Sequence, residues 1–386
     1  MQDCYMKTYH RLPVVFTRGE GAYLFDASGK KYLDMTAGIA VNCLGHRHPA
    51  LLEVIRTQSE KLIHVCNYYQ SDIALVFAEK LTRAAGMKNV FLSNSGAEAN
   101  EGACKIARKY SLKKHGEGRH TIVSLRGSFH GRTITTLAAT GQDSFHKNFG
   151  PFTEGFRFVQ GGDIDALDKA LDASVAGLLI EVVQGESGVH PQTQEYIKAA
   201  ARFCRDRDIL LMFDEVQCGL GRTGKFLACE HYGVKPDLVT LAKGLAGGIP
   251  IGAVLAGEKT ADVFETGDHG STFGGNPLAA ACANAVLDIV TEKNFLDSIT
   301  DTGNYLMDGL KSLKNSKGQA PISAVRGLGL IVGADLSVNA RPVLEKALEN
   351  SLLVLSAGEK TLRFVPPYII TKAQIDEALA ILRTIL

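Results

Sequence analysis

The 386-residue chain lacks tryptophan and any long run of apolar residues, and it carries almost no net charge. Its 42 lysines and arginines balance 41 aspartates and glutamates, so no overall field favours nucleic acid or an anionic membrane. No apolar stretch approaches the roughly 20 residues that span a bilayer, and residues 1–11 are too polar for a signal peptide. We therefore expect a cytoplasmic protein that binds neither nucleic acid nor membrane.

The eight cysteines also lack the spacing of a metal site or of a redox pair. None belongs to a CxxC pair, and several lie in apolar helical patterns, where a free thiol behaves as a small hydrophobic side chain. His46 and His48 stand close together before Pro49, but no third ligand has a fitting spacing. We expect reduced thiols and no metal.

Short apolar strands alternate with helical segments from about residue 50 onward. The clearest strands are apolar on both faces and cover residues 90–92, 121–124, 177–183, 209–213 and 238–241. The clearest helical period covers residues 194–207, and a long alanine-rich helix follows Asn276 and Pro277. This alternation predicts an α/β fold in which helices cover both faces of a mostly parallel sheet.

The chain is longer than one hydrophobic core ordinarily supports, so we expect two domains. A large domain is expected at residues 51–275 and a smaller α+β domain at 276–386. Residues 20–36 read as short strands around a turn, and we expect residues 1–50 to join the small domain.

An acid and a lysine follow two neighbouring predicted strands. Asp214 ends the run 209–213, and Lys243 follows the next strand 29 residues later, about one βαβ unit. Ligands of open parallel sheets bind at the carboxyl ends of the strands, where these side chains would meet. Pyridoxal phosphate (PLP) needs both groups, because a lysine forms the imine and a carboxylate keeps the ring nitrogen protonated. Separately, each has an ordinary interpretation, a turn-capping aspartate and a solvated lysine.

The segment after the strand at 90–92 has the form of an anion site. Ser95, Gly96 and Ala97 form a turn of small residues that leads into a predicted helix. Backbone N–H groups at the start of a helix bind phosphate. A simple serine N-cap predicts the same residues.

Residues 219–224 match the GxGxxG dinucleotide fingerprint. That fingerprint requires a strand directly before it, whereas residues 214–218 intervene here. A nicotinamide-dependent oxidoreductase therefore remains a distant alternative.

Several blocks together resemble the class III (ornithine-type) aminotransferases, PLP enzymes of fold type I. The match runs from about residue 10 to the C-terminus, and it is most specific at residues 211–224 and 242–244, with further blocks at 94–101 and 128–133. The resemblance implies that Lys243 holds PLP as a Schiff base and that Asp214 binds the ring nitrogen. It further implies a cofactor site that includes Ser95, Gly96, Ala97, Phe129, Glu215, Val216, Gln217 and, from a partner subunit, Thr272.

Within this class, residues 37–41, 44–46, 67–69 and 267–277 look typical of the branch that acts on N-acetylornithine. The resemblance implies a homodimer with shared active sites that transfers an ω-amino group to 2-oxoglutarate in arginine biosynthesis. Arg132 is then expected to bind the α-carboxylate of the donor, and Ser271 its acyl-amino end. Ornithine, succinylornithine and acyl-lysine stay open as donors, and a non-catalytic PLP binder is a further alternative.

Two further charged residues suit the binding of two different substrates. Arg363 can clamp a carboxylate through two hydrogen bonds. Glu186, after the strand at 177–183, could pair with Arg363 while the amine donor is bound and release it for glutamate. The alternative for Arg363 is an ordinary arginine beside a strand.

Overall fold

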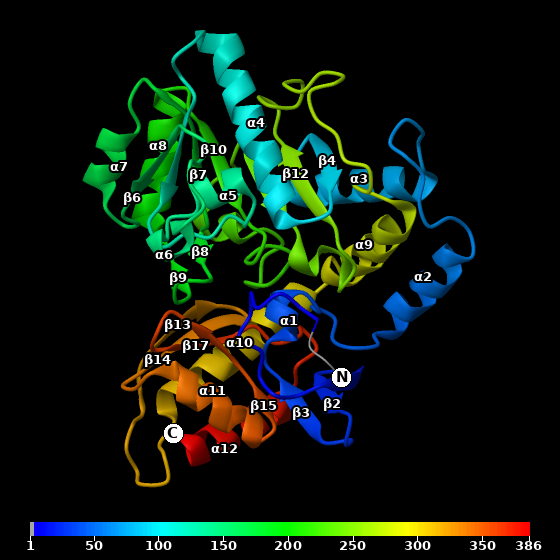
Figure 1. Ribbon diagram of the computed structural model, residues 1–386, viewed down its shortest axis with the longest axis vertical. Helices are drawn as coiled ribbons and strands as arrows, with labels where there is room; N and C mark the ends of the chain where they lie inside the picture. The colour runs from blue at the N-terminus through cyan, green and yellow to red at the C-terminus, as the bar shows by residue number, and fades with distance from the viewer. Residues whose placement is uncertain (1–3) are drawn as a thin grey trace.

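The computed structural model describes residues 4–386 and contains a seven-stranded sheet (Figure 1). Neighbouring strands pair in parallel except at β12, which is antiparallel to both of its neighbours. The mostly parallel sheet is thereby confirmed. The strand order is β4 (Asn89–Ser93), β12 (Gly252–Ala256), β11 (Leu238–Leu241), β10 (Leu210–Asp214), β7 (Val175–Ile180), β5 (Thr121–Leu125) and β6 (Phe156–Val159).

Alternate side chains of the strands pack on opposite faces of this sheet. Leu210 and Met212 pack in a core with α4 (Gly96–His115), whereas Leu211 and Phe213 belong to the main core with α8 (Gln194–Asp206). Both faces are therefore covered, which explains why the strands read as continuous apolar runs. Helix α8 lies within one residue of its predicted range.

The other helices of this part of the chain connect the strands or pack beside β4. Asn276 caps α9 (Pro277–Val290) by accepting from Ala279 N at 3.0 Å, and α9 packs against α2, α3 and η2. The remaining elements are α2 (Pro49–Ser59), α3 (Asp72–Ala85), α5 (Ile134–Ala139), α6 (Asp143–His146), α7 (Ile164–Ala170), the 3₁₀ turns η1 (Ala228–Tyr232) and η2 (Lys243–Ala246), and the short pair β8 (Val183–Gln184) and β9 (His190–Pro191).

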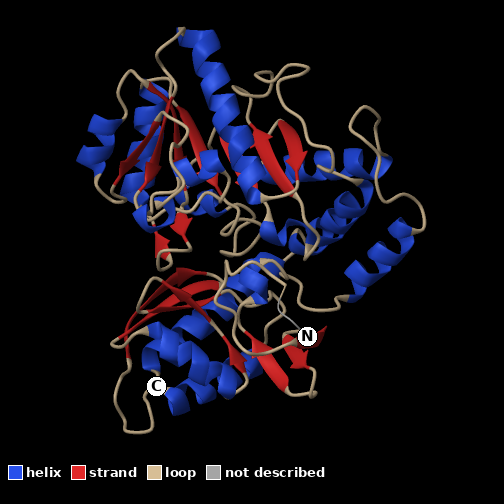
Figure 2. Cartoon of the chain, in the orientation of Figure 1, coloured by secondary structure: helices blue, strands red, loops and turns tan. Residues whose placement is uncertain are grey.

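The two ends of the chain build a second group of sheets and helices, drawn below the large sheet in Figures 1 and 2. Strand β3 pairs in parallel with β15, so the N-terminal strands join the C-terminal region. One sheet contains β1 (Phe16–Glu20), β2 (Tyr23–Asp26), β3 (Lys31–Asp34) and β15 (Leu352–Leu353), and the other contains β13 (Ile322–Leu328), β14 (Ile331–Leu336), β17 (Thr361–Phe364) and β16 (Leu355–Ala357). The accompanying helices are α1 (Ala37–Ala40), α10 (Phe295–Ser312), α11 (Ala340–Glu349) and α12 (Lys372–Ile385). The exact domain boundaries stay a prediction.

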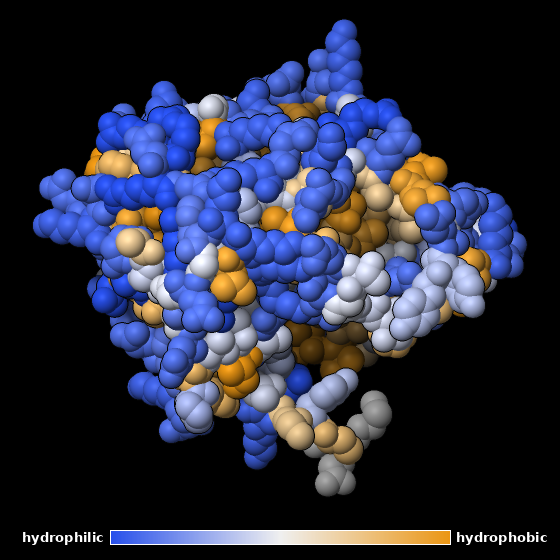
Figure 3. Space-filling model, turned by 90° about the horizontal axis from the view of Figure 1, so that it is seen from above, coloured by the Kyte–Doolittle hydropathy of each residue, from blue (hydrophilic) through white to orange (hydrophobic). Residues whose placement is uncertain are grey.

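Some local features differ from expectation. Strand β12 was not predicted, and the strand expected at 177–183 ends at Ile180, which places Glu181 at the edge of the sheet. The face shown in Figure 3 is mostly hydrophilic, and hydrophobic residues appear there in small separate areas. Within residues 4–386, no helix is long and apolar enough to cross a bilayer.

Candidate active site

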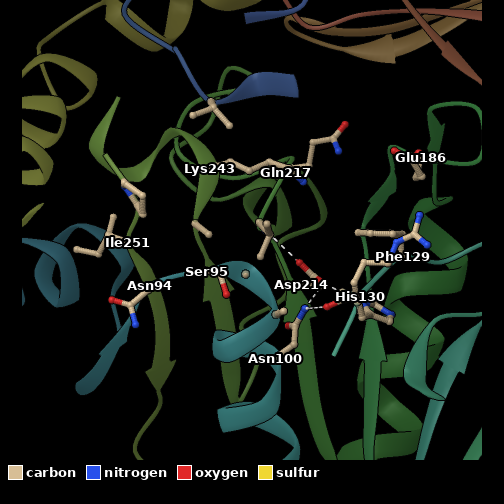
Figure 4. A pocket seen from close by; sticks show the side chains of 18 of the residues that line it. Asn94, Ser95, Asn100, Phe129, His130, Glu186, Asp214, Gln217, Lys243 and Ile251 are labelled. Atoms are coloured by element: carbon tan, nitrogen blue, oxygen red, sulfur yellow. Dashed lines mark hydrogen bonds and ion pairs between the residues drawn. The ribbon is translucent and has the colours of Figure 1, made fainter. Parts of the chain in front are cut away.

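A cavity of about 440 Å³ opens at the carboxyl ends of the parallel strands (Figure 4). Asp214 ends β10, Lys243 follows β11, and the segments after β4, β5 and β7 supply most of the other side chains. The antiparallel β12 begins at the same edge. The cavity is lined by Val41, Asn94, Ser95, Gly96, Ala97, Asn100, Phe129, His130, Gly131, Arg132, Glu181, Glu186, Asp214, Val216, Gln217, Ala242, Lys243, Gly248, Ile249, Pro250 and Ile251.

Asp214 is a buried carboxylate that three donors hold in place. Its Oδ2 accepts from Asn100 Nδ2 and from His130 Nδ1, each at 2.7 Å, and its Oδ1 accepts from Val216 N at 3.0 Å. Thr240, the register partner of Asp214 on β11, donates to Asn100 Oδ1 at 2.7 Å and so fixes which way the amide points. This network holds the carboxylate in a fixed direction.

Lys243 is the first residue of η2 and has the positive φ of 43° that side chains other than glycine rarely adopt. No described residue accepts a hydrogen bond from its Nζ. Burial lowers the pKa of the amine, and the charge of Asp214 opposes that shift in part. A strained backbone and an unpaired amine in a cavity mark a functional position.

The start of α4 combines both interpretations of Ser95. The Ser95 hydroxyl accepts from Glu98 N at 3.2 Å as an N-cap, while Ser95, Gly96 and Ala97 line the cavity. Gly96 must lack a side chain, because a Cβ there would lie 2.7 Å from Val216 Cγ1. The first-turn N–H groups therefore approach the cavity closely enough to bind an anion.

Phe129 and Arg132 form another side of the cavity. The ring of Phe129 packs edge-on against Phe145 with 5.9 Å between centroids. The guanidinium of Arg132 stacks over the Phe145 ring at 3.9 Å and lines the cavity. An exposed arginine in this place can bind a carboxylate.

The structure brings Glu186 and Arg363 together. Arg363, on β17, is 2% exposed and donates through Nη1 to Glu186 Oε2 at 2.8 Å and to the carbonyl of Gly185 at 3.0 Å. Gln217 Oε1 lies 3.4 Å from the same nitrogen. Among the described residues, nothing bonds to the buried Nε of Arg363. Its charge is thus only partly satisfied behind the cavity wall.

Other predicted site residues lie outside the cavity. The side chain of Glu215 turns away, and its two oxygens accept from Ala228 N at 2.5 Å and Cys229 N at 2.8 Å. It therefore holds the chain after β10, and its contact with the cofactor stays a prediction. Thr272 is exposed and outside the cavity of its own chain, while Ser271 Oγ accepts from the cavity residue Asn94 at 3.1 Å. The prediction that Thr272 contributes to the cofactor site of a partner subunit stays a prediction.

The glycines of the GxGxxG match pack against helices instead of opening one. A Cβ on Gly221 would lie 2.9 Å from Leu296, and one on Gly224 would lie 2.0 Å from Thr300. No helix begins directly after this segment, since the next element is η1 at Ala228. Within the described chain, no group of His, Cys, Asp and Glu side chains is arranged to hold a metal ion.

Four polar residues at the site had no predicted role: Asn100, His130, Glu181 and Thr240. All surround Asp214 or the Phe129 loop. Asn100 and His130 lie inside the sequence blocks that carry the family resemblance. The pairing of Thr240 with Asp214 could have been inferred from the strand register, but the fold is needed to bring Glu181 to Phe129.

The residues present fit PLP. Lys243 offers an amine that faces the cavity without a partner, and Asp214 offers a fixed carboxylate for a protonated ring nitrogen. The start of α4 suits a phosphate, and Phe129 and Val216 provide apolar walls for a ring.

Comparisons with known proteins agree with this arrangement. The family model of the class-III aminotransferases matches residues 4–386. The acetylornithine aminotransferase of Caldanaerobacter subterraneus subsp. tengcongensis is 49% identical over 382 residues, which is 99% of this chain and 96% of that protein. Its counterpart from Methanocaldococcus jannaschii is 46% identical over 372 residues, which is 96% of this chain and 93% of that protein.

Solved structures give the same result. The ornithine aminotransferase from Toxoplasma gondii superposes with a TM-score of 0.93 at 34% identity and covers 98% of this chain and 91% of its own. A second structure of that enzyme is described as having partial occupancy of PLP at the active site. The N-acetylornithine aminotransferase from Stenotrophomonas maltophilia gives a TM-score of 0.84 at 38% identity and covers 97% and 96%.

Proposed function

Because the chain belongs to the class III aminotransferases and is a PLP-dependent enzyme of fold type I, we propose that it acts on N²-acetyl-L-ornithine. It transfers the δ-amino group to 2-oxoglutarate and yields N-acetyl-L-glutamate 5-semialdehyde and L-glutamate (EC 2.6.1.11). This reaction is a step of arginine biosynthesis, and we place the enzyme in the cytoplasm. The observation that carries the proposal is one cavity lined by Lys243, Asp214 and Glu186, in which Glu186 pairs with Arg363 behind the cavity wall.

PLP, when bound, links covalently to an amino group and acts as an electron sink for the adjacent C–H bond. Asp214 would stabilise the positive charge of the ring nitrogen, and its donors Asn100 and His130 keep its direction fixed. Ser95, Gly96 and Ala97 would hold the phosphate. Gln217 and Val216 follow Asp214 and face the same cavity.

Lys243 moves the proton. Its Nζ takes a proton from the substrate carbon that carries the amino group and later returns one, as general base and general acid. The lowered pKa of this amine, caused by burial, keeps more of it in the neutral form that can accept a proton. Efficient transfer needs such a pKa nearer to the working pH.

Arg363 and Glu186 allow two unlike substrates to use one cavity. Acetylornithine presents methylene groups where glutamate presents an α-carboxylate, and an unpaired buried guanidinium beside methylene groups is costly. The ion pair neutralises Arg363 during the acetylornithine half-reaction. When the pair opens, Arg363 binds the carboxylate of glutamate. Arg132 binds the α-carboxylate of acetylornithine.

A homodimer with shared active sites is part of the proposal. Ser271 of the partner binds the acyl-amino end of the donor, and Thr272 of the partner binds the cofactor phosphate. Exposed apolar side chains support an interface beside these residues: Ile63 is 55%, Tyr68 96%, and Phe273 62% exposed. Asn67 joins the segment 63–68 to the segment 271–273 by donating to the carbonyl of Ser271 at 2.9 Å.

A donor panel tests the proposed function. The purified protein should show the visible absorption band of PLP bound to Lys243, and Lys243→Ala should lose both this band and turnover. Acetylornithine, succinylornithine, ornithine and acyl-lysine are compared by kcat/KM with 2-oxoglutarate as acceptor. We expect the highest value for acetylornithine. A higher value for ornithine would favour the second candidate, an ornithine aminotransferase, which the likeness to the Toxoplasma structure supports.

A further inference from the structure

Glu181 connects two loops of the cavity through its two carboxylate oxygens. It follows β7 directly, is 5% exposed, and lines the cavity. Its Oε1 accepts from Phe129 N at 2.8 Å, and its Oε2 accepts from Gly185 N at 3.4 Å. Phe129 and Glu186, next to Gly185, lie on the same side of the cavity in Figure 4. One buried carboxylate thus spans both loops.

The backbone of Gly185 is held at both its N–H and its carbonyl. Its N–H donates to Glu181, and its carbonyl accepts from Arg363 Nη1 at 3.0 Å, the nitrogen that also donates to Glu186. A Cβ at Gly185 would lie 2.3 Å from Gln217 Oε1, so a side chain there would displace the Gln217 amide. If Arg363 releases both Glu186 and the Gly185 carbonyl, the bond from the Gly185 N–H to Glu181 still holds this backbone.

We propose that Glu181 is a positioning residue. It keeps the loop of Glu186 in a fixed position relative to the loop of Phe129, so that the Glu186–Arg363 pair forms again after each glutamate half-reaction. This inference rests on the proposed function. Burial has the largest effect on the Glu181 carboxyl and raises its pKa, and the charge of Asp214 acts in the same direction. His130 and the two backbone N–H donors of Phe129 and Gly185 lower the pKa. The same two N–H bonds that join the loops therefore also stabilise the charged form of Glu181.

The first arm of the test needs no substrate. In Glu181→Gln, the new NH₂ group faces one of the two backbone N–H donors, so at least one of the two bonds is lost. Hydrogen exchange at Phe129 or Gly185 in the full-length holoenzyme should become at least about tenfold faster. Unchanged exchange at both amides overturns the proposal.

The second arm is a double-mutant cycle with Glu186→Gln. Single-turnover rates give the ratio of the acetylornithine half-reaction to the glutamate half-reaction. Glu181→Gln should lower this ratio about fivefold or more, since the closed pair serves only acetylornithine. In the Glu186→Gln background the same change should alter the ratio less than about twofold. Equal effects in both backgrounds overturn the proposal.

A matched control is Glu215→Gln, which removes another buried carboxylate that accepts from two backbone N–H groups. It should lose stability without coupling to Glu186. If Glu181→Gln does not fold, Glu181→Asp keeps the charge but is too short to reach both donors, and the same two readouts apply. A wild-type enzyme that does not turn over acetylornithine would refute the proposed function, while the exchange arm would still decide the role of Glu181.

Discussion

Lys243, the proposed catalytic residue, has features that destabilise the fold locally. Its backbone has a positive φ, its amine has no partner among the described residues, and burial lowers the pKa of that amine. Such features persist only where the surroundings enforce them, and they cluster at active sites. The functional role of the residue therefore predicts a measurable effect on stability.

We expect Lys243→Met to stabilise the cofactor-free protein while abolishing turnover. Methionine keeps the length and the backbone strain but removes an amine that loses hydration on burial. Below an unfolded pKa of about 10.4, the unfolded chain binds a proton that the folded amine resists, so this residue destabilises the fold increasingly as pH falls toward the folded pKa.

Thermal melts of the cofactor-free proteins from pH 7 to 11 check this expectation. The melting temperature of the variant should exceed that of the wild type at pH 7, and the difference should shrink as pH approaches 11. A variant that melts lower than the wild type at pH 7 would contradict it.

Glu215 gives a second prediction from a buried charge. Burial raises the pKa of Glu215 from its ordinary value of about 4.5 to about 7. Between these values the folded protein holds a proton that the unfolded chain has lost, so the contribution of Glu215 to stability falls as pH rises from about 4.5 to 7.

In Glu215→Gln this contribution is absent. The free energy of unfolding of the wild type should therefore decline relative to the variant by up to about 3 kcal/mol across this pH interval, since one pKa unit corresponds to about 1.4 kcal/mol. Urea denaturation at several pH values measures the difference. A constant difference across the interval would show that Glu215 keeps its ordinary pKa.

At the scale of elements, the sequence was informative wherever a pattern is local. The apolar runs of β10 and β11 and the period of α8 are visible in the chain, so the places of Asp214 and Lys243 at adjacent strand ends could be predicted. Strand β12 escaped prediction because it is a short run of small apolar residues after a loop with glycines and a proline. The contact of Glu181 with Phe129 joins residues 52 apart and depends on how β5 and β7 pair.

Arg222 connects two elements that lie far apart in sequence. Its buried guanidinium donates to the carbonyls of Leu330 at 3.1 Å and Pro366 at 2.5 Å and stacks 4.4 Å over the ring of Tyr368. Pro366 lies three residues after Arg363, so Arg222 holds the segment that follows the arginine proposed to bind the glutamate carboxylate.

Arg222→Lys should lose the stacking and at least one of these bonds. We expect a loss of about 2–4 kcal/mol in stability, because the ammonium is then buried with fewer partners. A shift of the segment after β17 should also move Arg363. The KM for 2-oxoglutarate should therefore rise more than the KM for acetylornithine. Melting curves and the two KM values test this, and an equal rise in both KM values would show that Arg222 only stabilises the fold.

At the scale of the whole molecule, the cavity depends on both halves of the chain. Lys243 and Asp214 come from the large sheet, whereas Arg363 reaches Glu186 and Gln217 from β17 of the C-terminal sheet. Movement of one part against the other therefore changes the carboxylate-binding side of the cavity more than the side that carries Lys243. The Arg363 side of the cavity and the Lys243 side are thus built by different parts of the fold.

The proposed homodimer leads to a complementation test between two impaired parent proteins. Thr272 lies outside the cavity of its own chain, so Thr272→Ala should weaken cofactor retention only in the partner's site, and Lys243→Ala abolishes catalysis in its own. In a mixed dimer, one site combines the intact Lys243 of one subunit with the intact Thr272 of the other. Random exchange makes about half of the dimers mixed, each with one intact site of two, so equal mixtures should recover about a quarter of wild-type activity at limiting PLP. Cofactor-limited assays, with subunit exchange verified by differently tagged chains, measure the recovery. If exchange is complete and activity stays at the level of the parents, each chain builds its own site without Thr272 of its partner.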